Sequence, residues 1–341
     1  MSPSGSGRYR VIVAVSAACA VLALLAVFIG VVDLAPREVL EVLAGRGSAS
    51  ARLVILEVRL PRVITGMLAG AQFAMAGYLL QTITRNPLAD PSIMGVSQGA
   101  TLAVTVFLLV TVYGASAAGN VEVYALPEAW LPVIGCAGGV VAGLLVYLLA
   151  LRHDLDPLRI TLCGIAVGTL LQALAVGLIA GWGSSRLEIL LQWLAGSLYA
   201  RSWDNVLFLA PFTAAGALAV PLARRLIELL QFDSSVARSF GLSYRASFTP
   251  VLALACGLAA SAVGVVGPMV FVGLVVPHLA RFVTRADQRL QLPATASLGA
   301  ALVTAADLLG RVSGRAEEIP VGVMTAMLSA PVLIVILRRT R

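Results

Sequence analysis

The stretch from Ser261 to Arg281 constrains the fold most. It reads SAVGVVGPMVFVGLVVPHLAR and is almost wholly apolar. It nevertheless carries residues that would break a long helix in water, namely Gly264, Gly267, Pro268, Gly273 and Pro277. In a bilayer, interrupted helices persist where they pack on neighbouring helices or border a water-filled cavity. The stretch therefore indicates a membrane-embedded segment, and tight packing and the lining of a passage are both compatible with it.

Composition extends this interpretation to the whole chain. The protein has 341 residues, of which 59% are hydrophobic and 12% charged, and no polar stretch is long enough for a separate soluble domain. We therefore predict an all-α, polytopic membrane protein whose residues 1–341 form a single transmembrane domain. Runs near the 20 residues that a bilayer requires predict ten spans, at about 11–32, 62–82, 92–112, 130–151, 160–181, 204–222, 248–267, 268–284, 295–310 and 318–337.

An even number of spans places both termini on the same side of the membrane. The arginines near both ends of the chain, Arg8 and Arg10 in a short tail over residues 1–10 and Arg338 to Arg341, predict that this side is the cytoplasm. The loop from Asp33 to Arg62 would then lie outside the cell. It is rich in arginine but also carries four acids, so a solvated loop and a basic dock for an acidic partner both remain open.

The basic residues exclude one class of enzyme. All 24 of them are arginine, so a phosphate-binding GxxxxGK[ST] loop cannot be formed. If ATP drives this protein, another subunit must hydrolyse it. The cysteines (Cys19, Cys136, Cys163 and Cys256) lie in apolar runs without CxxC spacing, which suggests neither a disulfide framework nor a zinc site. No bound metal, no other cofactor and no catalytic residue is expected in this chain.

Ionisable residues are scarce within the predicted spans. Asp307 and His278 are the main ones, with Glu318 at a boundary. Ion-coupled transporters usually carry their coupling ion on intramembrane acids or bases, so the chain is poorly equipped for that mechanism. His278 lies near a span end, where we expect a structural hydrogen bond to a backbone carbonyl.

A short amphipathic helix is predicted between two spans, in residues 233–243. Asp233 or Ser234 can cap its start, Gly241 can end it, and the apolar Val236 and Phe240 share one face. This helix could dock a cytoplasmic partner or lie on the membrane surface, and the sequence favours neither.

Small residues recur at helical spacing in several spans. They predict faces where backbones approach closely, as a bundle of many helices requires. The sets are Gly66, Gly70 and Ala74; Gly135, Gly139 and Gly143; Gly164 and Gly168; and Gly177 and Gly181.

These features together resemble a known family, from about Leu53 to Leu337. The chain is similar to the permease subunits of ABC importers for ferric siderophores, haem and cobalamin, the FecCD-type family. The similarity is carried by stretches in a fixed order, namely RLPR at 59–62, GAQFAMAGYLLQTITRNPLADPSIMGVSQGA at 70–100, LQWLAGSL at 191–198, SFGLS at 239–243, GPMVFVGLVVPHLAR at 267–281, ADLLGR at 306–311 and EEIPVGVMTAMLSAP at 317–331.

The resemblance implies a ten-helix permease of the ABC type II importer fold in a bacterial cell membrane. It implies a homodimer or a heterodimer with a sister permease, surrounded by membrane lipids, on two cytoplasmic ATPase subunits that hold ATP and Mg. A separate extracytoplasmic binding protein would deliver a ferric siderophore, with haem or cobalamin as the alternative cargo. No nucleic acid partner is implied, and an ion-coupled secondary transporter is the competing class.

The resemblance also assigns roles to single positions. Docking of the binding protein falls to Arg59, Arg62 and Arg311. Coupling to the ATPase falls to Ser235, Ala237, Ser239, Phe240, Gly241 and Leu242. The translocation path would be bordered by Gln72, Met75, Gln81, Ser97, Gln98, Gly264, Pro268, Phe271 and Gly273.

Overall fold

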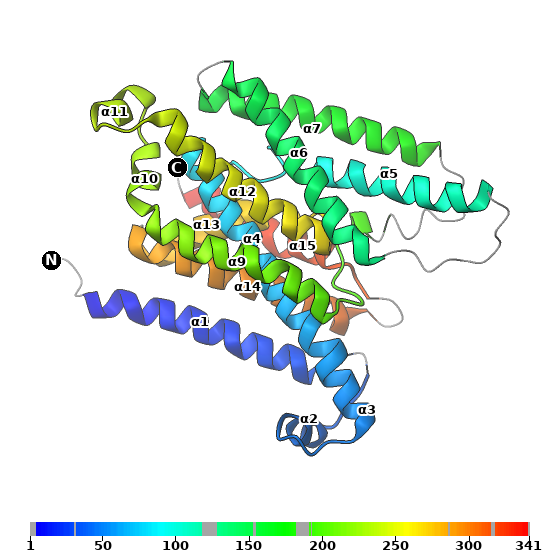
Figure 1. Ribbon diagram of the computed structural model, residues 1–341. Coiled ribbons are helices and arrows are strands. Elements are labelled where there is room, and N and C mark those ends of the chain that lie inside the picture. The colour runs from blue at the N-terminus through cyan, green and yellow to red at the C-terminus, as the bar shows by residue number, and fades with distance from the viewer. Residues whose placement is uncertain are drawn as a thin grey trace. The chain divides into compact units, whose positions relative to one another are not determined.

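A computed structural model describes residues 5–30, 32–117, 128–152, 155–181, 191, 193–285, 287–314 and 318–339. Within these ranges every regular element is a helix, as predicted (Figure 1). The elements are α1 (Gly5–Phe28), α2 (Pro36–Leu43), α3 (Ala49–Arg52), η1 (Leu53–Arg59), α4 (Leu60–Ile83), α5 (Val96–Ala117), η2 (Glu128–Trp130), α6 (Leu131–Leu151), α7 (Pro157–Ala180), α9 (Trp203–Leu222), α10 (Arg224–Leu230), α11 (Ser234–Ser239), α12 (Tyr244–Val266), α13 (Val272–Val283), α14 (Gln288–Ser313) and α15 (Val321–Arg339).

Each predicted span contains an apolar helix. Seven helical segments of the described residues are long and apolar enough to cross a bilayer, and shorter apolar helices occupy Val96–Thr111, Val272–Val283 and Val321–Val335. The polytopic all-α class is therefore confirmed. The predicted tail is shorter than expected, because α1 already begins at Gly5; residues 1–4 lie outside the described part of the chain.

The described residues fall into two compact units. Unit 1 comprises Met1–Tyr78, Ala195–Ala214 and Met269–Arg341, and unit 2 comprises Leu79–Leu194 and Ala215–Pro268. In unit 1, α14 packs on α1, α13 and α15, and in unit 2, α6 packs on α5, α7 and α12. Both units interleave along the sequence, so neither is a continuous piece of chain.

The glycine- and proline-rich stretch is a pair of helices with a break between them. Helix α12 ends at Val266, and the chain turns through Gly267 and Phe271, whose φ angles are +79° and +69°. Only glycine adopts such angles without strain, so Phe271 is held there against its own preference. Pro268 lies in this break and interrupts no helix, contrary to the expectation for a helix-breaking residue, whereas Pro277 is inside α13.

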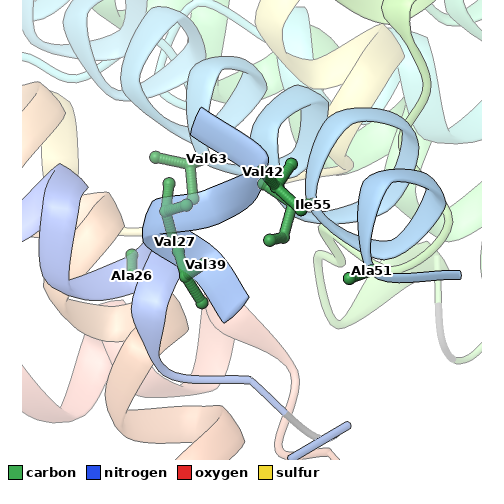
Figure 2. Packing of buried hydrophobic residues seen from close by; sticks show 7 residues of the cluster. All are labelled: Ala26, Val27, Val39, Val42, Ala51, Ile55 and Val63. Carbon is green, nitrogen blue, oxygen red and sulfur yellow. The ribbon is translucent and has the colours of Figure 1, made fainter. Parts of the chain in front are cut away.

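The segment expected as a polar loop, residues 33–62, is mostly helical. Helix α2 packs Val39 and Val42 into a buried apolar cluster with residues of α1, α3, η1 and α4 (Figure 2). From Ala49 the chain is helical without interruption to Ile83, so this span begins earlier than the predicted position 62. The apolar run that includes Ile55, which is fully buried, accounts for the extension.

Close packing at glycines matches most of the predicted sets. A Cβ on Gly70 would lie 2.3 Å from the carbonyl oxygen of Gly299, and one on Gly135 would lie 2.8 Å from the Cα of Gly264. These positions therefore admit only glycine without a backbone shift. The set of Gly177 and Gly181 is an exception, because a Cβ at Gly177 would meet nothing within 4 Å and one at Gly181 would meet nothing closer than 3.7 Å; at Gly168 the nearest atom would lie 3.4 Å away.

Candidate functional site

Two of the predicted docking residues, Arg59 and Arg311, bind the carboxyl end of α1. A helix leaves its last carbonyls without partners in the helix, and cations are favoured there. Arg59 ends η1, a π-helical segment, and donates from Nη1 to the carbonyls of Val27 and Phe28 at 2.8 and 2.9 Å. Arg311 in α14 donates from Nη1 to the carbonyl of Ala26 at 3.1 Å. The two side chains thus hold α1 against η1 and α14.

Gly30 provides the space for this arrangement. A Cβ at Gly30 would lie 2.7 Å from Nε of Arg59, and the Arg59 guanidinium also donates to the carbonyl of Val32. The chain therefore wraps closely around Arg59, whose exposed fraction is 4%.

The third docking residue, Arg62, is paired with two acids. It donates from Nη2 to Oδ1 of Asp307 and to Oε2 of Glu318, both at 2.7 Å, and from Nη1 to Oε1 of Glu318 at 3.0 Å. Asp307 also lies 3.0 Å from Nη2 of Arg311. These groups are mostly buried, because the side chains of Arg62, Asp307 and Glu318 are 12%, 4% and 25% exposed.

We call Arg59, Arg62, Arg311, Asp307 and Glu318 the charged cluster. The structure brings the three predicted arginines together in unit 1, and it adds two acids, Asp307 and Glu318, which the sequence analysis named only as ionisable groups within a span and at a span boundary. The sequence did hold a signal for this pairing, since an acid inside a membrane span, such as Asp307, requires a basic partner. Whether the cluster docks a binding protein remains a prediction.

The helix predicted in residues 233–243 is present as α11, and its end is as expected. Asp233 lies at the N-cap position but its side chain makes no capping bond, and Gly241 has a φ of +81°. The amide of Leu242 bonds to the carbonyl of Ala237 and that of Gly241 to Arg238, which is the glycine-ended helix stop expected from the sequence.

Two apolar side chains are exposed on α11 and directly after it, beside polar exposed positions. Phe240 is 68% exposed and Val236 is 40% exposed, while Ala237 is fully buried and anchors the helix. Among the other predicted coupling positions, Ser239 is exposed, and its hydroxyl donates to the carbonyl of Val236 at 2.7 Å. Ser235 is exposed as well, whereas Leu242 is half-buried.

The predicted path residues come from both units and differ in exposure. Six of them are buried, namely Gln72, Met75, Gln81, Ser97, Gly264 and Gly273. Gln98, Pro268 and Phe271 are half-buried. The Gln72 amide donates to the carbonyl of Leu209 at 2.8 Å and to Oγ1 of Thr213 at 2.7 Å, so it ties α4 to α9. Their role in translocation stays a prediction.

A pocket of about 710 Å³ opens in unit 2 beside α11. It is lined by the loop after α4, the start of α7 and the start of α11. At its edge, the guanidinium of Arg85 pairs with the carboxylate of Asp233 and donates from Nη2 to the hydroxyl of Tyr244 at 3.4 Å.

The loop after α4 also holds a buried acid. Oδ1 of Asp90 accepts the amide of Ser92 at 2.9 Å and its hydroxyl at 2.7 Å, while Oδ2 is buried with no hydrogen-bond partner in the described part of the chain. Burial raises the pKa of the Asp90 carboxyl, and the bonds from Ser92 offset part of that rise.

Two further expectations concern residues that could carry chemistry. Nδ1 of His278 donates to the carbonyl of Leu274 at 2.9 Å, which confirms the predicted structural bond. Across the described ranges, no group of three or more histidine, cysteine or acidic side chains could hold a metal ion.

Comparison with known proteins decides the family. The model of the FecCD transport family matches residues 18–339. The chain belongs to the FecCD transport family. Among FecCD relatives, the ferric enterobactin transport system permease protein FepD of Escherichia coli is 37% identical over 92% of this chain and 91% of its own length. The cobalamin import system permease protein BtuC of Halobacterium salinarum is 34% identical over 85% of this chain and 74% of its own length.

A solved structure supports the same fold. An inward-facing ABC transporter described as of metal-chelate type is 26% identical, with a TM-score of 0.81 over 97% of this chain and 99% of that one. This FecCD chain is therefore a multi-pass permease, a transporter subunit rather than an enzyme.

Proposed function

We propose that this FecCD chain is the membrane permease of an ATP-driven importer that passes a ferric siderophore into the cytoplasm. The observation that carries the proposal is the family match over residues 18–339, in which FepD, a ferric enterobactin permease, is the relative of 37% identity. Another relative, a cobalamin import system permease protein, is 34% identical. Cobalamin or haem is therefore the alternative cargo.

The charged cluster argues against an ion-coupled mechanism. Asp307 is held between Arg62 and Arg311, at 2.7 and 3.0 Å. Asp307 is thus the counter-ion of two guanidinium groups within the chain, and it is not a separate intramembrane acid of the kind that carries a coupling ion.

The assembly in this proposal has two permease chains, identical or sister, and two cytoplasmic ATPase subunits that bind ATP and Mg. An extracytoplasmic protein delivers the cargo, and both permease termini face the cytoplasm of a bacterial cell. The absence of lysine supports the separate ATPase, since the chain cannot form a phosphate-binding loop.

Uptake into proteoliposomes tests the cargo and the energy source together. The permease is reconstituted with its ATPase and binding protein and offered radiolabelled ferric siderophores, ferric citrate, haem and cobalamin, with and without internal ATP. We expect uptake of a ferric siderophore only when ATP and binding protein are present. Uptake driven by an ion gradient without ATP would refute the importer mechanism.

We further propose that the charged cluster forms part of the dock for the binding protein. Two of its arginines, Arg59 and Arg311, are buried, the side chain of Arg62 is 12% exposed, and all three are already bonded within the chain. They would act mainly through the positive potential they give to the surface, and Glu318, a quarter exposed, is the acid that weakens it.

A gain of affinity tests this dock better than charge reversal, which would disrupt the buried bonds. Glu318→Gln leaves Arg62 paired with Asp307 and removes one negative charge. We expect it to tighten the binding protein several-fold in nanodiscs at low salt, with the gain shrinking as salt is raised. Unchanged or weaker binding would contradict docking at this cluster.

For α11 we propose contact with the ATPase through Phe240 and Val236. The support is an exposed apolar pair on a helix whose other side is anchored by Ala237. Phe240→Ala should lower complex formation and turnover, whereas Leu222→Ala, an 87% exposed leucine at the end of α9, should not. Equal behaviour of the two variants would remove the proposed contact.

For the translocation path we propose that Gln98, Pro268 and Phe271 contribute first, because they are half-buried whereas the other six predicted positions are buried. Single cysteines at these positions, in a chain without its native cysteines, should react with a water-soluble thiol reagent faster than a cysteine at Met75. Equal protection at all four positions would contradict this assignment.

A further inference from the structure

Arg85 joins three elements of unit 2. It follows α4, pairs with the carboxylate of Asp233 directly before α11, and donates to the hydroxyl of Tyr244, the first residue of α12. Helix α11 and the start of α12 are neighbours in Figure 1 and pack on each other. A single side chain therefore connects the end of one span to α11 and to the start of another.

Arg85 and Asp233, which form this connection, both have unfavourable local geometry. Arg85 has a φ of +52°, a left-handed conformation that residues with a Cβ rarely adopt. Asp233 occupies the position before α11 where a carboxylate normally caps the helix, yet its side chain makes no capping bond. Both residues give up a favourable local arrangement, which indicates that the ion pair is retained for its position rather than as a by-product of folding.

Beside the pocket, the Arg85–Asp233 ion pair directly links α11 to the end of α4. Between the loop after α4, the start of α7 and the start of α11 lies an open volume of about 710 Å³ rather than packed side chains. Displacement of a helix is transmitted by contacts, and an open pocket transmits none. Where α11 borders the pocket, movement can reach the end of α4 through the Arg85–Asp233 pair.

We propose that Arg85 is a positioning residue that transmits movement of α11 to the ends of α4 and α12, so that hydrolysis by the ATPase is converted into transport. This rests on the proposed function, in which α11 contacts the ATPase. The link requires opposite charges at positions 85 and 233, and it predicts that breaking the pair separates transport from hydrolysis without preventing assembly.

The test uses the complete importer in proteoliposomes and measures uptake per ATP hydrolysed. Arg85→Met and Asp233→Asn should assemble normally and hydrolyse ATP, with at least fivefold less uptake per ATP. The charge exchange Arg85→Asp with Asp233→Arg should restore part of that ratio, since it re-forms the pair. Arg225→Met is the matched control, because this exposed arginine on α10 should leave the ratio unchanged.

The outcomes distinguish the Arg85–Asp233 link from the proposed contact between α11 and the ATPase. Wild-type uptake per ATP in Arg85→Met and Asp233→Asn would overturn the link, even if Phe240→Ala still weakens the complex. Poor assembly of the single variants with no improvement in the charge exchange would likewise overturn it, since the residues would then serve stability alone. If Phe240→Ala changes neither assembly nor turnover, docking through α11 fails first and the link fails with it.

Discussion

Removal of Arg62 should destabilise the protein more than removal of any exposed arginine. In the native chain Arg62 and Arg311 balance Asp307 and Glu318, with Arg62 at 2.7 Å from both acids. Arg62→Met leaves one guanidinium facing two acids, of which Asp307 is only 4% exposed. Breaking a buried ion pair from one side costs about 3–5 kcal/mol, and the partial exposure of Glu318 places the expected loss near the lower end, about 3 kcal/mol.

A second substitution should recover much of that loss. Arg62→Met combined with Glu318→Gln leaves Asp307 and Arg311, which lie 3.0 Å apart, as a balanced pair. We expect the double variant to regain about 2 kcal/mol relative to Arg62→Met, because the charge left unpaired by the first change has been removed.

Thermal unfolding in detergent, followed by tryptophan fluorescence, measures these differences under one set of conditions. Arg37→Met provides the matched control, because Arg37 forms an ion pair with Glu41 at 3.0 Å whose side chains are 89% and 45% exposed. That variant should lose less than about 0.5 kcal/mol. The reasoning is refuted if Arg62→Met behaves like the control, or if the double variant is less stable than the single one.

Other sites give predictions with their own controls. Gly77→Ala would place a Cβ 1.9 Å from the carbonyl oxygen of Gly273 and should cost about 3 kcal/mol in the same unfolding assay, whereas Gly177→Ala should be neutral or stabilising; equal losses would contradict the packing argument. Because the pKa of Asp90 is raised on folding, its protonated form stabilises the fold at low pH and this contribution is lost as pH rises. Asp90→Asn keeps an oxygen for Ser92 and should raise the melting temperature at pH 8 but not at acidic pH; a pH-independent difference would count against a buried, titrating carboxyl.

Much of the fold could be predicted from the sequence because a bilayer leaves few solutions. Apolar runs of about 20 residues must be helices there, so the spans followed from length and composition. Helix α11 was also predictable, since its stop signal at Gly241 is local. Such features depend on residues a few positions apart.

The charged cluster could not be predicted in the same way. Arg62 and Asp307 are separated by 245 positions, and no local pattern assigns one to the other. The π-helical segment that ends at Arg59 and the helical course from Ala49 were missed for a related reason. Charged residues in that segment indicated a loop in water, whereas Arg59 is bonded to carbonyls of α1 and Arg62 is paired with Asp307 and Glu318. Gly177 shows the opposite error, because helical spacing alone does not show which face meets a neighbour.

The bonds at the end of α1 have a consequence for biosynthesis. Helix α1 is made well before α14, yet one of the two arginines that bind its terminal carbonyls, Arg311, lies 285 positions after Ala26. The apolar span of α1 is only 17% buried, and it packs mainly on α14. During synthesis Arg59 can bind the end of α1 early, whereas the packing of α1 along its length is completed only after α14 has been inserted.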